Sequence, residues 1–155
     1  MRSALLLSGG MDSLSIAWWK RPEIGITIDY GQLAAQAEIT ASQLICRRLG
    51  IEHHVVRIDC RSLGSGDMAG ADADCHAPAS DWWPYRNQIL ITFAAARSLS
   101  LGVGRLMIGT VKSDSAHRDG TSDFVDAMNA LVALQEGGIR VEAPAIHLAT
   151  VELVR

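Results

Sequence analysis

The sequence predicts an α/β fold, a doubly wound parallel sheet of five strands with helices on both faces. Short apolar runs alternate along the whole chain with segments of helical period, which is typical of βαβ units. Two glycines, Gly9 and Gly10, directly follow the first apolar run, as at a tight turn from a strand into a helix. A length of 155 residues suits one core, so we expect a single domain over residues 1–155.

The composition argues against several classes of function. The chain is 48% hydrophobic and 20% charged, as globular proteins are, and its net charge of −3 gives no electrostatic basis for binding nucleic acid. No apolar run approaches the length of a membrane span, so we expect no membrane partner and a cytoplasmic location. Cys46, Cys60 and Cys75 are odd in number and far apart, which indicates neither a disulfide framework nor a paired-cysteine zinc site. Cys46 is expected in the core, and Cys75 with its neighbour His76 is a candidate metal pair in a loop.

The first strand is expected over Ala4–Leu7 and the first helix over Leu14–Lys20, with Asp12 as the helix cap. Between them lies Ser8–Ser13, at the positive end of the helix, where unpaired N–H groups accommodate an anion. Its two serine hydroxyls can donate to phosphate oxygens, and its carboxylate can hold the accompanying Mg²⁺. The segment lacks the Gly-Lys-Ser/Thr ending of the Walker loop and the spacing of the dinucleotide fingerprint.

Two further strands are expected over Ile24–Ile28 and His54–Ile58. They flank an amphipathic helix over Leu33–Leu49, which Gly50 ends. The two adjacent histidines at the start of the later strand would point to opposite faces of it. They therefore indicate an edge of the sheet more than a metal site.

Residues 60–84 lose the periodic pattern and are rich in glycine and aspartate, which predicts a long loop inserted in the domain. Loops of this length are often lids or binding segments, and a mobile excursion without function is the alternative. The loop runs into Trp82–Asn87, which combines aromatic faces with a cation and an amide. Such a group could hold a flat heterocycle or a phosphate, or its tryptophans could seal the core.

A strongly apolar helix is expected over Gln88–Leu101, followed by a strand over Arg105–Ile108. That strand leads into the polar segment Gly109–Asp114, at the carboxyl edge where open parallel sheets bind ligands. The remaining expected elements are a helix capped by Ser122 that runs to about Gln135, a strand over Ile139–Ala143, and the beginning of a helix at Thr150.

Ser8–Ser13 resembles the SGGxDS signature of the PP-loop ATP pyrophosphatases. Within that group the chain resembles the QueC family of 7-cyano-7-deazaguanine synthases over nearly its whole length. Several separate motifs occur in the family's order, and this makes the resemblance specific. They are Asp29–Gln32 with Glu38 following, Arg86–Asn87, Ile108–Gly109 with Asp114, Phe124–Asn129 and Ala143–Pro144.

The resemblance implies an adenine nucleotide α-hydrolase-like fold, with ATP and Mg²⁺ as cofactors. It implies a nucleotide site made of Ser8, Gly9, Gly10, Met11, Asp12, Ser13 and Gly109, with the Mg²⁺ near Asp12 and bound through phosphate. The implied substrate-binding residues are Tyr30, Gln32, Arg86, Asn87, Asp114 and Asp119. The implied catalytic residues are Asp12, Arg86 and Lys112. The two cations are candidates to offset negative charge that develops in the reaction, and an exposed surface cation is the alternative for each.

The resemblance also implies a reaction. An acid such as 7-carboxy-7-deazaguanine is activated as its AMP ester while pyrophosphate leaves, and ammonia then displaces AMP to give an amide, which a second activation turns into a nitrile. Such chemistry needs positioning and charge neutralisation above all. The implied partners are the deazapurine acid and ammonia, and the family commonly forms dimers.

Three departures from the family pattern leave alternatives open. His117–Thr121 stands where the family has Tyr-Pro-Asp-Cys-Arg, so that Asp119 matches the family's aspartate only by a shifted alignment. Thr150 stands where a lysine is usual, and the sequence stops at Arg155, before the family's four-cysteine zinc site, so we expect no zinc. The chain is then a QueC-like ligase, a related enzyme that joins a deazapurine to a protein amine, or a nucleotide-binding paralogue without catalysis.

Overall fold

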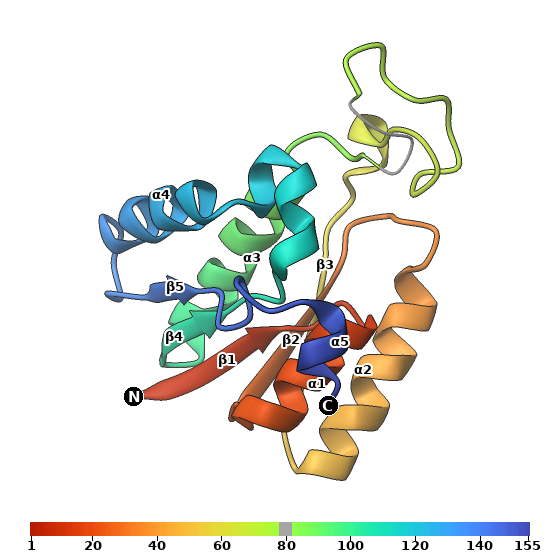
Figure 1. The fold of residues 1–155 in the computed structure, drawn as a ribbon. Coiled ribbons are helices and arrows are strands. Elements are labelled where there is room, and N and C mark those ends of the chain that lie inside the picture. The colour runs from red at the N-terminus through yellow and green to blue at the C-terminus, as the bar shows by residue number, and fades with distance from the viewer. Residues whose placement is uncertain (78–81) are drawn as a thin grey trace.

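The computed structural model describes residues 1–77 and 82–155, and its centre is a parallel sheet (Figure 1). The strands are β1 (Arg2–Leu6), β2 (Ile24–Asp29), β3 (Glu52–Arg57), β4 (Val103–Met107) and β5 (Arg140–Glu142). They are ordered β3-β2-β1-β4-β5, and every neighbouring pair is parallel, with Ala4 opposite both Ile24 and Leu106. The predicted doubly wound five-stranded α/β fold is confirmed.

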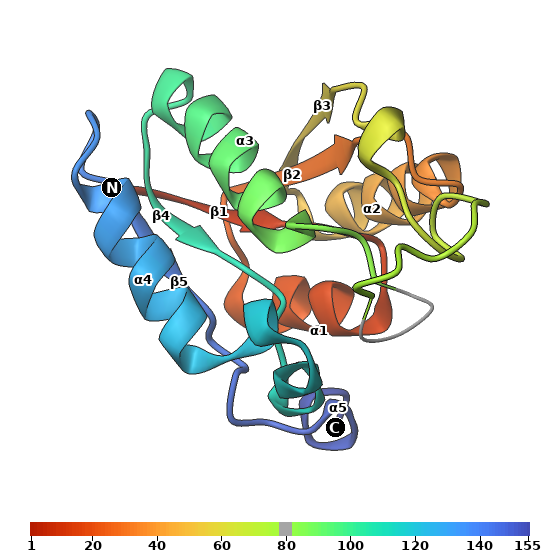
Figure 2. The same cartoon turned by 90° about the horizontal axis from the view of Figure 1, so that it is seen from above.

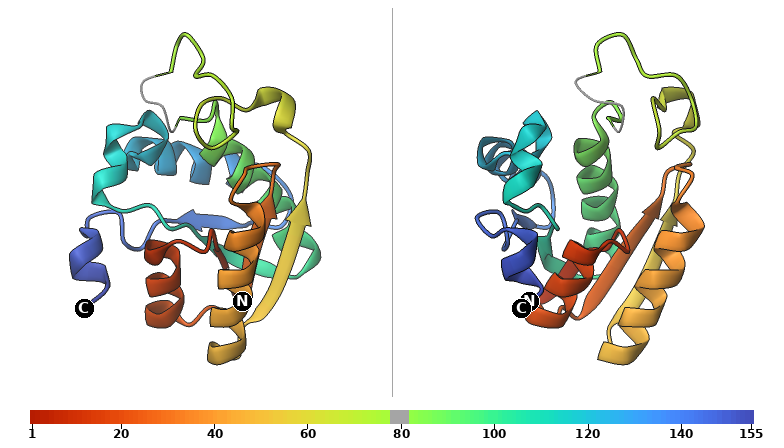
Figure 3. Two further views of the ribbon diagram at one scale, coloured as in Figure 1. Left: turned by 90° about the vertical axis from the view of Figure 1, so that its right-hand side faces the viewer. Right: turned by 45° about the vertical axis from the view of Figure 1, so that its right-hand side comes forward.

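Helices cover both faces of the sheet (Figures 2 and 3). One layer contains α1 (Met11–Lys20), α2 (Ala35–Leu49) and the short α5 (Thr150–Leu153), and the other contains α3 (Arg86–Ser100) and α4 (Ser122–Ala133). Each layer has its own apolar cluster against the sheet, which explains why the central strands are apolar on both sides. No helix in the described part of the chain is both long and apolar enough to cross a bilayer.

The chain changes direction across the sheet between β1 and β4. The strands after β1 proceed to one side as far as β3, and β4 returns to lie beside β1 on the other side. Connections on the two sides therefore diverge at the carboxyl ends of β1 and β4, and a crevice forms there in doubly wound folds.

Two helix caps differ from the prediction. The N-cap of α1 is Gly10, and Asp12 lies inside the first turn, so the prediction of Asp12 as cap is wrong. The N-cap of α4 is Thr121 and not Ser122, because Thr121 has an extended backbone and its Oγ1 accepts a hydrogen bond of 3.2 Å from the Phe124 N–H. That helix also ends at Ala133, two residues before the predicted end.

The edge strand β3 carries the paired histidines, as the sequence predicts. His53 Nε2 lies 2.8 Å from Thr27 Oγ1 on β2, whereas His54 Nε2 lies 2.7 Å from Glu52 Oε1. Both rings thus bind side chains of the sheet, and neither belongs to a metal cluster in the described residues.

The loop at 60–84 begins with a short 3₁₀ turn, η1 (Arg61–Leu63), and then runs above the carboxyl ends of the strands (Figure 1). Residues 78–81 of this loop, which include Pro78 and Asp81, lie outside the described residues. The Leu33 N–H donates to the Met68 carbonyl at 3.0 Å and ties the loop to the segment before α2. Trp83 is 2% exposed and meets Tyr30 edge-on, with ring centroids 4.9 Å apart, so this tryptophan seals the core.

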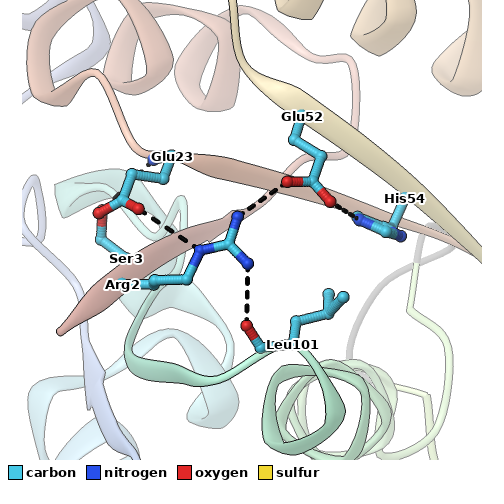
Figure 4. Close-up of polar contacts among 6 residues, drawn as sticks. All are labelled: Arg2, Ser3, Glu23, Glu52, His54 and Leu101. Atoms are coloured by element: carbon cyan, nitrogen blue, oxygen red, sulfur yellow. Dashed lines mark hydrogen bonds and ion pairs between the residues drawn. The ribbon is translucent and has the colours of Figure 1, made fainter.

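Ion pairs join the amino ends of the strands (Figure 4). The Arg2 guanidinium contacts Glu52 at 2.8 Å and Glu23 at 3.4 Å, and it donates to the Leu101 carbonyl at 3.0 Å. Hydrogen bonds from His54 and Arg2 lower the pKa of Glu52 below its ordinary value. These residues stand at or next to the beginnings of β1 to β4, so the network aligns that edge of the sheet, opposite the edge where ligands are expected.

Candidate functional site

A cavity of about 300 Å³ opens at the carboxyl edge of the sheet, at the divergence between β1 and β4. It brings together segments that are up to about a hundred residues apart in the sequence. Most of the predicted site residues line it: Ser8, Gly10, Met11, Asp12, Ser13, Tyr30, Arg86, Asn87, Gly109, Asp114 and Asp119.

Hydrogen bonds within the segment Ser8–Ser13 shape the phosphate loop. The Ser8 N–H donates to Ser13 Oγ at 3.3 Å, Ser13 Oγ donates to the Gly10 carbonyl at 3.2 Å, and the Gly10 N–H donates to Ser8 Oγ at 3.4 Å. The turn leads straight into α1, whose first N–H groups have no acceptor within the helix. The geometry suits an anion at the end of the helix.

Gly9 does not line the cavity but makes the loop's shape compatible with α2. It has a φ of +77°, and a Cβ there would lie 2.7 Å from the Glu38 carbonyl oxygen and 2.8 Å from the Glu38 Cα. Both neighbours are backbone atoms of α2, so a side chain has no room. A glycine is thus required where the phosphate loop touches the first turn of that helix.

Asp12 fits the expected Mg²⁺. Its Oδ1 is buried in the cavity wall and has no hydrogen-bond partner among the described residues. An unpaired buried carboxylate oxygen is unfavourable unless a cation or donor binds it. Mg²⁺ prefers oxygen ligands and is held in proteins by one or two carboxylates together with phosphate. The residues present therefore suit a phosphate-bound Mg²⁺.

Tyr30, Glu38 and Arg86 form a charged and polar group on the cavity wall. Burial raises the pKa of Tyr30 to about 12, although the Arg86 charge opposes the shift. Burial also raises the pKa of Glu38, while a hydrogen bond from Gln32 and the Arg86 charge oppose this rise. Arg86 directs Nη1 toward Met68 Sδ at 3.2 Å, so the inserted loop also helps to hold the guanidinium.

Asn87 and Asp119 join α3 to the 3₁₀ turn η3 (Arg118–Gly120). Asn87 Nδ2 donates to the Asp119 carbonyl at 3.0 Å, and the Asn87 N–H donates to Asp119 Oδ2 at 3.3 Å. Asp119 thereby caps the beginning of α3 across 32 residues of sequence. This interaction brings the segment that departs from the family pattern against the cavity.

Asp114 stabilises the other polar turn, η2 (Lys112–Ala116), because its Oδ2 accepts a hydrogen bond of 2.8 Å from the Val111 N–H. Gly120 packs on this turn so closely that any Cβ would collide with the Asp114 carbonyl oxygen. Gly109 faces the phosphate loop, and a Cβ there would lie 3.4 Å from Ser13 Cβ. The segment after β4 therefore lies against the first turn of α1.

Three predicted site residues lie elsewhere. Gly9 is the part of the phosphate loop that packs against α2. Gln32 is 4% exposed, with its side-chain amide bound to protein groups. Lys112 is exposed and is not among the residues that line the cavity, and its backbone N–H donates to the Leu148 carbonyl at 2.9 Å. In this structure Lys112 is therefore found as an exposed cation outside the lining of the cavity, and its role toward the reacting groups stays a prediction.

Several residues that line the cavity are not among the predicted site residues: Glu38, Met68, Leu90, Thr110, His117 and Gly120. Thr110 follows predicted Gly109 directly and His117 precedes predicted Asp119 by two positions, so both could have been found from that proximity. Met68 comes from the irregular loop, where no periodic pattern indicates which side chain turns inward. The candidate metal pair Cys75–His76 gains Asp74, with ligand atoms within 4.8 Å of one another, but all three residues are exposed and none lines the cavity.

Comparison with known proteins identifies the family. The family model described as "Queuosine biosynthesis protein QueC" matches residues 2–155. A 7-cyano-7-deazaguanine synthase of Chlorobium phaeobacteroides is 33% identical, with 100% of this chain and 76% of the relative covered. One from Desulforudis audaxviator is also 33% identical, over 99% of this chain and 80% of the relative, and one from Methanosarcina barkeri is 31% identical, over 100% and 78%. QueC proteins have the PP-loop adenine nucleotide α-hydrolase fold, which agrees with the strand order found here. The chain therefore belongs to the QueC family.

Proposed function

We propose that the chain is an ATP-dependent ligase that adenylates the carboxylate of 7-carboxy-7-deazaguanine or a related 7-deazapurine acid and passes the acyl group to ammonia. The products are AMP, pyrophosphate and an amide, which a second activation dehydrates to a nitrile. The observation that supports this most is the shared cavity: the Ser8–Ser13 loop and the beginning of α3, with Arg86 and Asn87, line the same 300 Å³ space.

Each group of cavity residues has a role in the proposed reaction that follows from its position. Backbone N–H groups and hydroxyls of Ser8–Ser13 hold the pyrophosphate that leaves, because they lie at the positive end of α1. Arg86 lies across the cavity and pairs with the substrate carboxylate, whose attack on the α-phosphorus it orients. Asn87 and Asp119 bind the heterocycle from the far wall. Asp12 would hold Mg²⁺, which neutralises charge on the pyrophosphate.

Pyrophosphate release over a panel of carboxylic acids tests the proposal. Release should depend on ATP and on the deazaguanine acid, and Asp12→Ala should lower it by at least about a hundredfold, since a metal-holding carboxylate is lost. Asp126→Ala, an exposed carboxylate on α4, is the matched control and should keep full activity. Release with other acids but none with the deazaguanine acid would reject this substrate.

A protein amine is the second candidate acceptor. The motivating observation is that the segment which replaces the family's Tyr-Pro-Asp-Cys-Arg lines the cavity through His117, Asp119 and Gly120. Intact-mass spectrometry of a partner protein expressed with this chain decides the matter, since a partner of unchanged mass excludes transfer to it. Tight binding of ATP without pyrophosphate release would instead indicate a non-catalytic paralogue.

A cytoplasmic location and a homodimer stay predictions. Sedimentation analysis would test whether the chain forms a homodimer.

A further inference from the structure

Glu38 is an acidic residue that lines the cavity and whose backbone touches the phosphate loop. It lies in the first turn of α2, and its own backbone is the surface against which Gly9 packs. Its side chain lines the cavity and is half-buried. A group anchored this close to the phosphate loop stands beside the place where the acyl phosphate bond forms and breaks in the proposed reaction.

Gln32 fixes the Glu38 carboxylate through a set of hydrogen bonds that uses its whole amide. Gln32 Nε2 donates to Glu38 Oε2 at 2.8 Å and to the Ile28 carbonyl at 3.1 Å, while its Oε1 accepts from the Tyr30 N–H at 2.9 Å. The amide is buried and belongs to the turn that follows β2. It therefore has one orientation, and that orientation sets the position of Glu38.

The remaining oxygen of Glu38 is available to a ligand. No hydrogen bond to Oε1 is found among the described residues. The carboxylates of Asp114 and Asp119 each accept a backbone N–H, from Val111 and Asn87, and so stabilise turns. Glu38 differs because a neutral side-chain amide binds one of its carboxylate oxygens, while the residue itself lines the cavity.

We propose that Glu38 is the general base that takes a proton from the nitrogen nucleophile, and that Gln32 positions it. This inference rests on the proposed function. Ammonia attacks the carbonyl carbon of the acyl-adenylate, the C–N bond forms, and the bond from that carbon to the phosphate oxygen breaks. AMP leaves with the bonding electron pair, and the proton that the nitrogen loses goes to Glu38 Oε1. The amide, AMP and a protonated Glu38 balance the step.

The electrostatic surroundings suit a base. Burial raises the pKa of Glu38 toward the working pH of the reaction, which strengthens it as a proton acceptor. Asp29 at the end of β2 acts in the same direction, whereas the Arg86 charge on α3 and the Gln32 hydrogen bond act against it. Tyr30, beside Arg86, stays neutral because its own pKa is about 12. The groups that act on the Glu38 carboxyl are thus the Asp29 anion, the Arg86 cation and the neutral Gln32 amide.

The experiment separates the two halves of the reaction in Glu38→Gln. Exchange of labelled pyrophosphate into ATP, dependent on 7-carboxy-7-deazaguanine, reports adenylation alone. Amide formation from ammonia reports the second half. We expect exchange to stay within a few-fold of the unsubstituted protein and amide formation to fall by about 10²–10⁴-fold. Hydroxylamine, which is largely unprotonated at neutral pH and strongly nucleophilic, should still trap the adenylate as a hydroxamate.

Each other outcome overturns a defined claim. Amide formation at the full rate in Glu38→Gln would overturn the role of Glu38 as base, and an equal loss of exchange and amide formation would place Glu38 in adenylation instead. Absence of acid-dependent exchange in the unsubstituted protein would overturn the proposed function itself and this inference with it. Glu136→Gln, an exposed carboxylate beyond α4, is the matched control and should change neither half.

Gln32→Met tests the positioning role by a readout that mere loss of packing would not move. The hydrogen bond from Gln32 lowers the pKa of Glu38, so removing that bond should raise this pKa. In the profile of amide-formation rate against pH, the acidic limb should then shift to higher pH. The profile is measured at a fixed concentration of free ammonia, so that the titration of ammonium does not contribute. An unshifted limb with lower activity would show that Gln32 acts only on folding.

Discussion

Replacing Gly9 by alanine should destabilise the protein much more than the same change at Gly10. Gly9 has a φ of +77°, which costs a residue with a Cβ about 1–3 kcal/mol. Its Cβ would also lie 2.7 Å from the Glu38 carbonyl oxygen, and forcing apart packed backbone costs about 1–3 kcal/mol more. The expected loss in the free energy of unfolding is therefore about 2–6 kcal/mol, a large share of the roughly 5–15 kcal/mol that stabilises a typical domain.

Gly10 is the control because it lacks both problems. Its φ is −77°, and the nearest atom to an added Cβ is Ser8 Oγ at 3.5 Å, an ordinary contact. Gly10→Ala should therefore cost less than about 1 kcal/mol, the scale of a changed N-cap. Thermal and urea denaturation followed by circular dichroism measure the difference.

In a chain of this size a loss of 2–6 kcal/mol lowers the melting temperature by roughly 5–20 °C. Equal melting temperatures for Gly9→Ala and Gly10→Ala would refute the reasoning, since the loop and α2 would then be free to separate. The same result would remove the contact that places Glu38 beside the phosphate loop.

Three further outcomes follow from burial and capping. The raised pKa of Tyr30 means that the folded state holds the phenolic proton more tightly, so the free energy of unfolding should fall as pH rises from about 10 through about 12, as denaturant titrations would show, with no such fall below pH 10. Burial raises the pKa of the Cys46 thiol to about 11, so a maleimide at pH 8 should label exposed Cys75 and leave Cys46 unlabelled until denaturant is added, as peptide mass spectrometry would report. Thr121→Ala should cost about 1 kcal/mol through loss of the α4 cap, whereas Ser122→Ala should cost a few tenths, and equal melting temperatures would contradict the cap assignment.

The sequence was most informative where one local rule decided the structure. The apolar runs predicted all five strands, because burial under helices on both faces leaves little choice of residue. The predicted cap of α4 failed because Thr121 and Ser122 are both good caps, and only the backbone conformation shows which of them precedes the helix. Element ends were therefore less predictable than the elements themselves.

The candidate site divides in the same way. The phosphate loop is continuous in sequence, and its glycines and serines predicted it correctly as a turn at the end of a strand. The opposite wall comes from segments that meet only in the folded chain. The position of Lys112 outside the lining and that of Met68 within it therefore had no local signal. Gln32 and Glu38 show a third case. Gln32 is expected to bind substrate, and the structure shows its amide hydrogen-bonded to Glu38, a contact that no local pattern predicts.

The cavity walls have a consequence for the life of the protein in the cell. They belong to both helical layers, and Gly109 after β4 lies against Ser13 in the first turn of α1. Any molecule bound there holds both halves of the sheet at once, and at a hundred times its dissociation constant it adds about 2.7 kcal/mol to the stability of the native state. Starvation that depletes such a ligand would then shorten the lifetime of the chain itself, because proteases act on the transiently opened form.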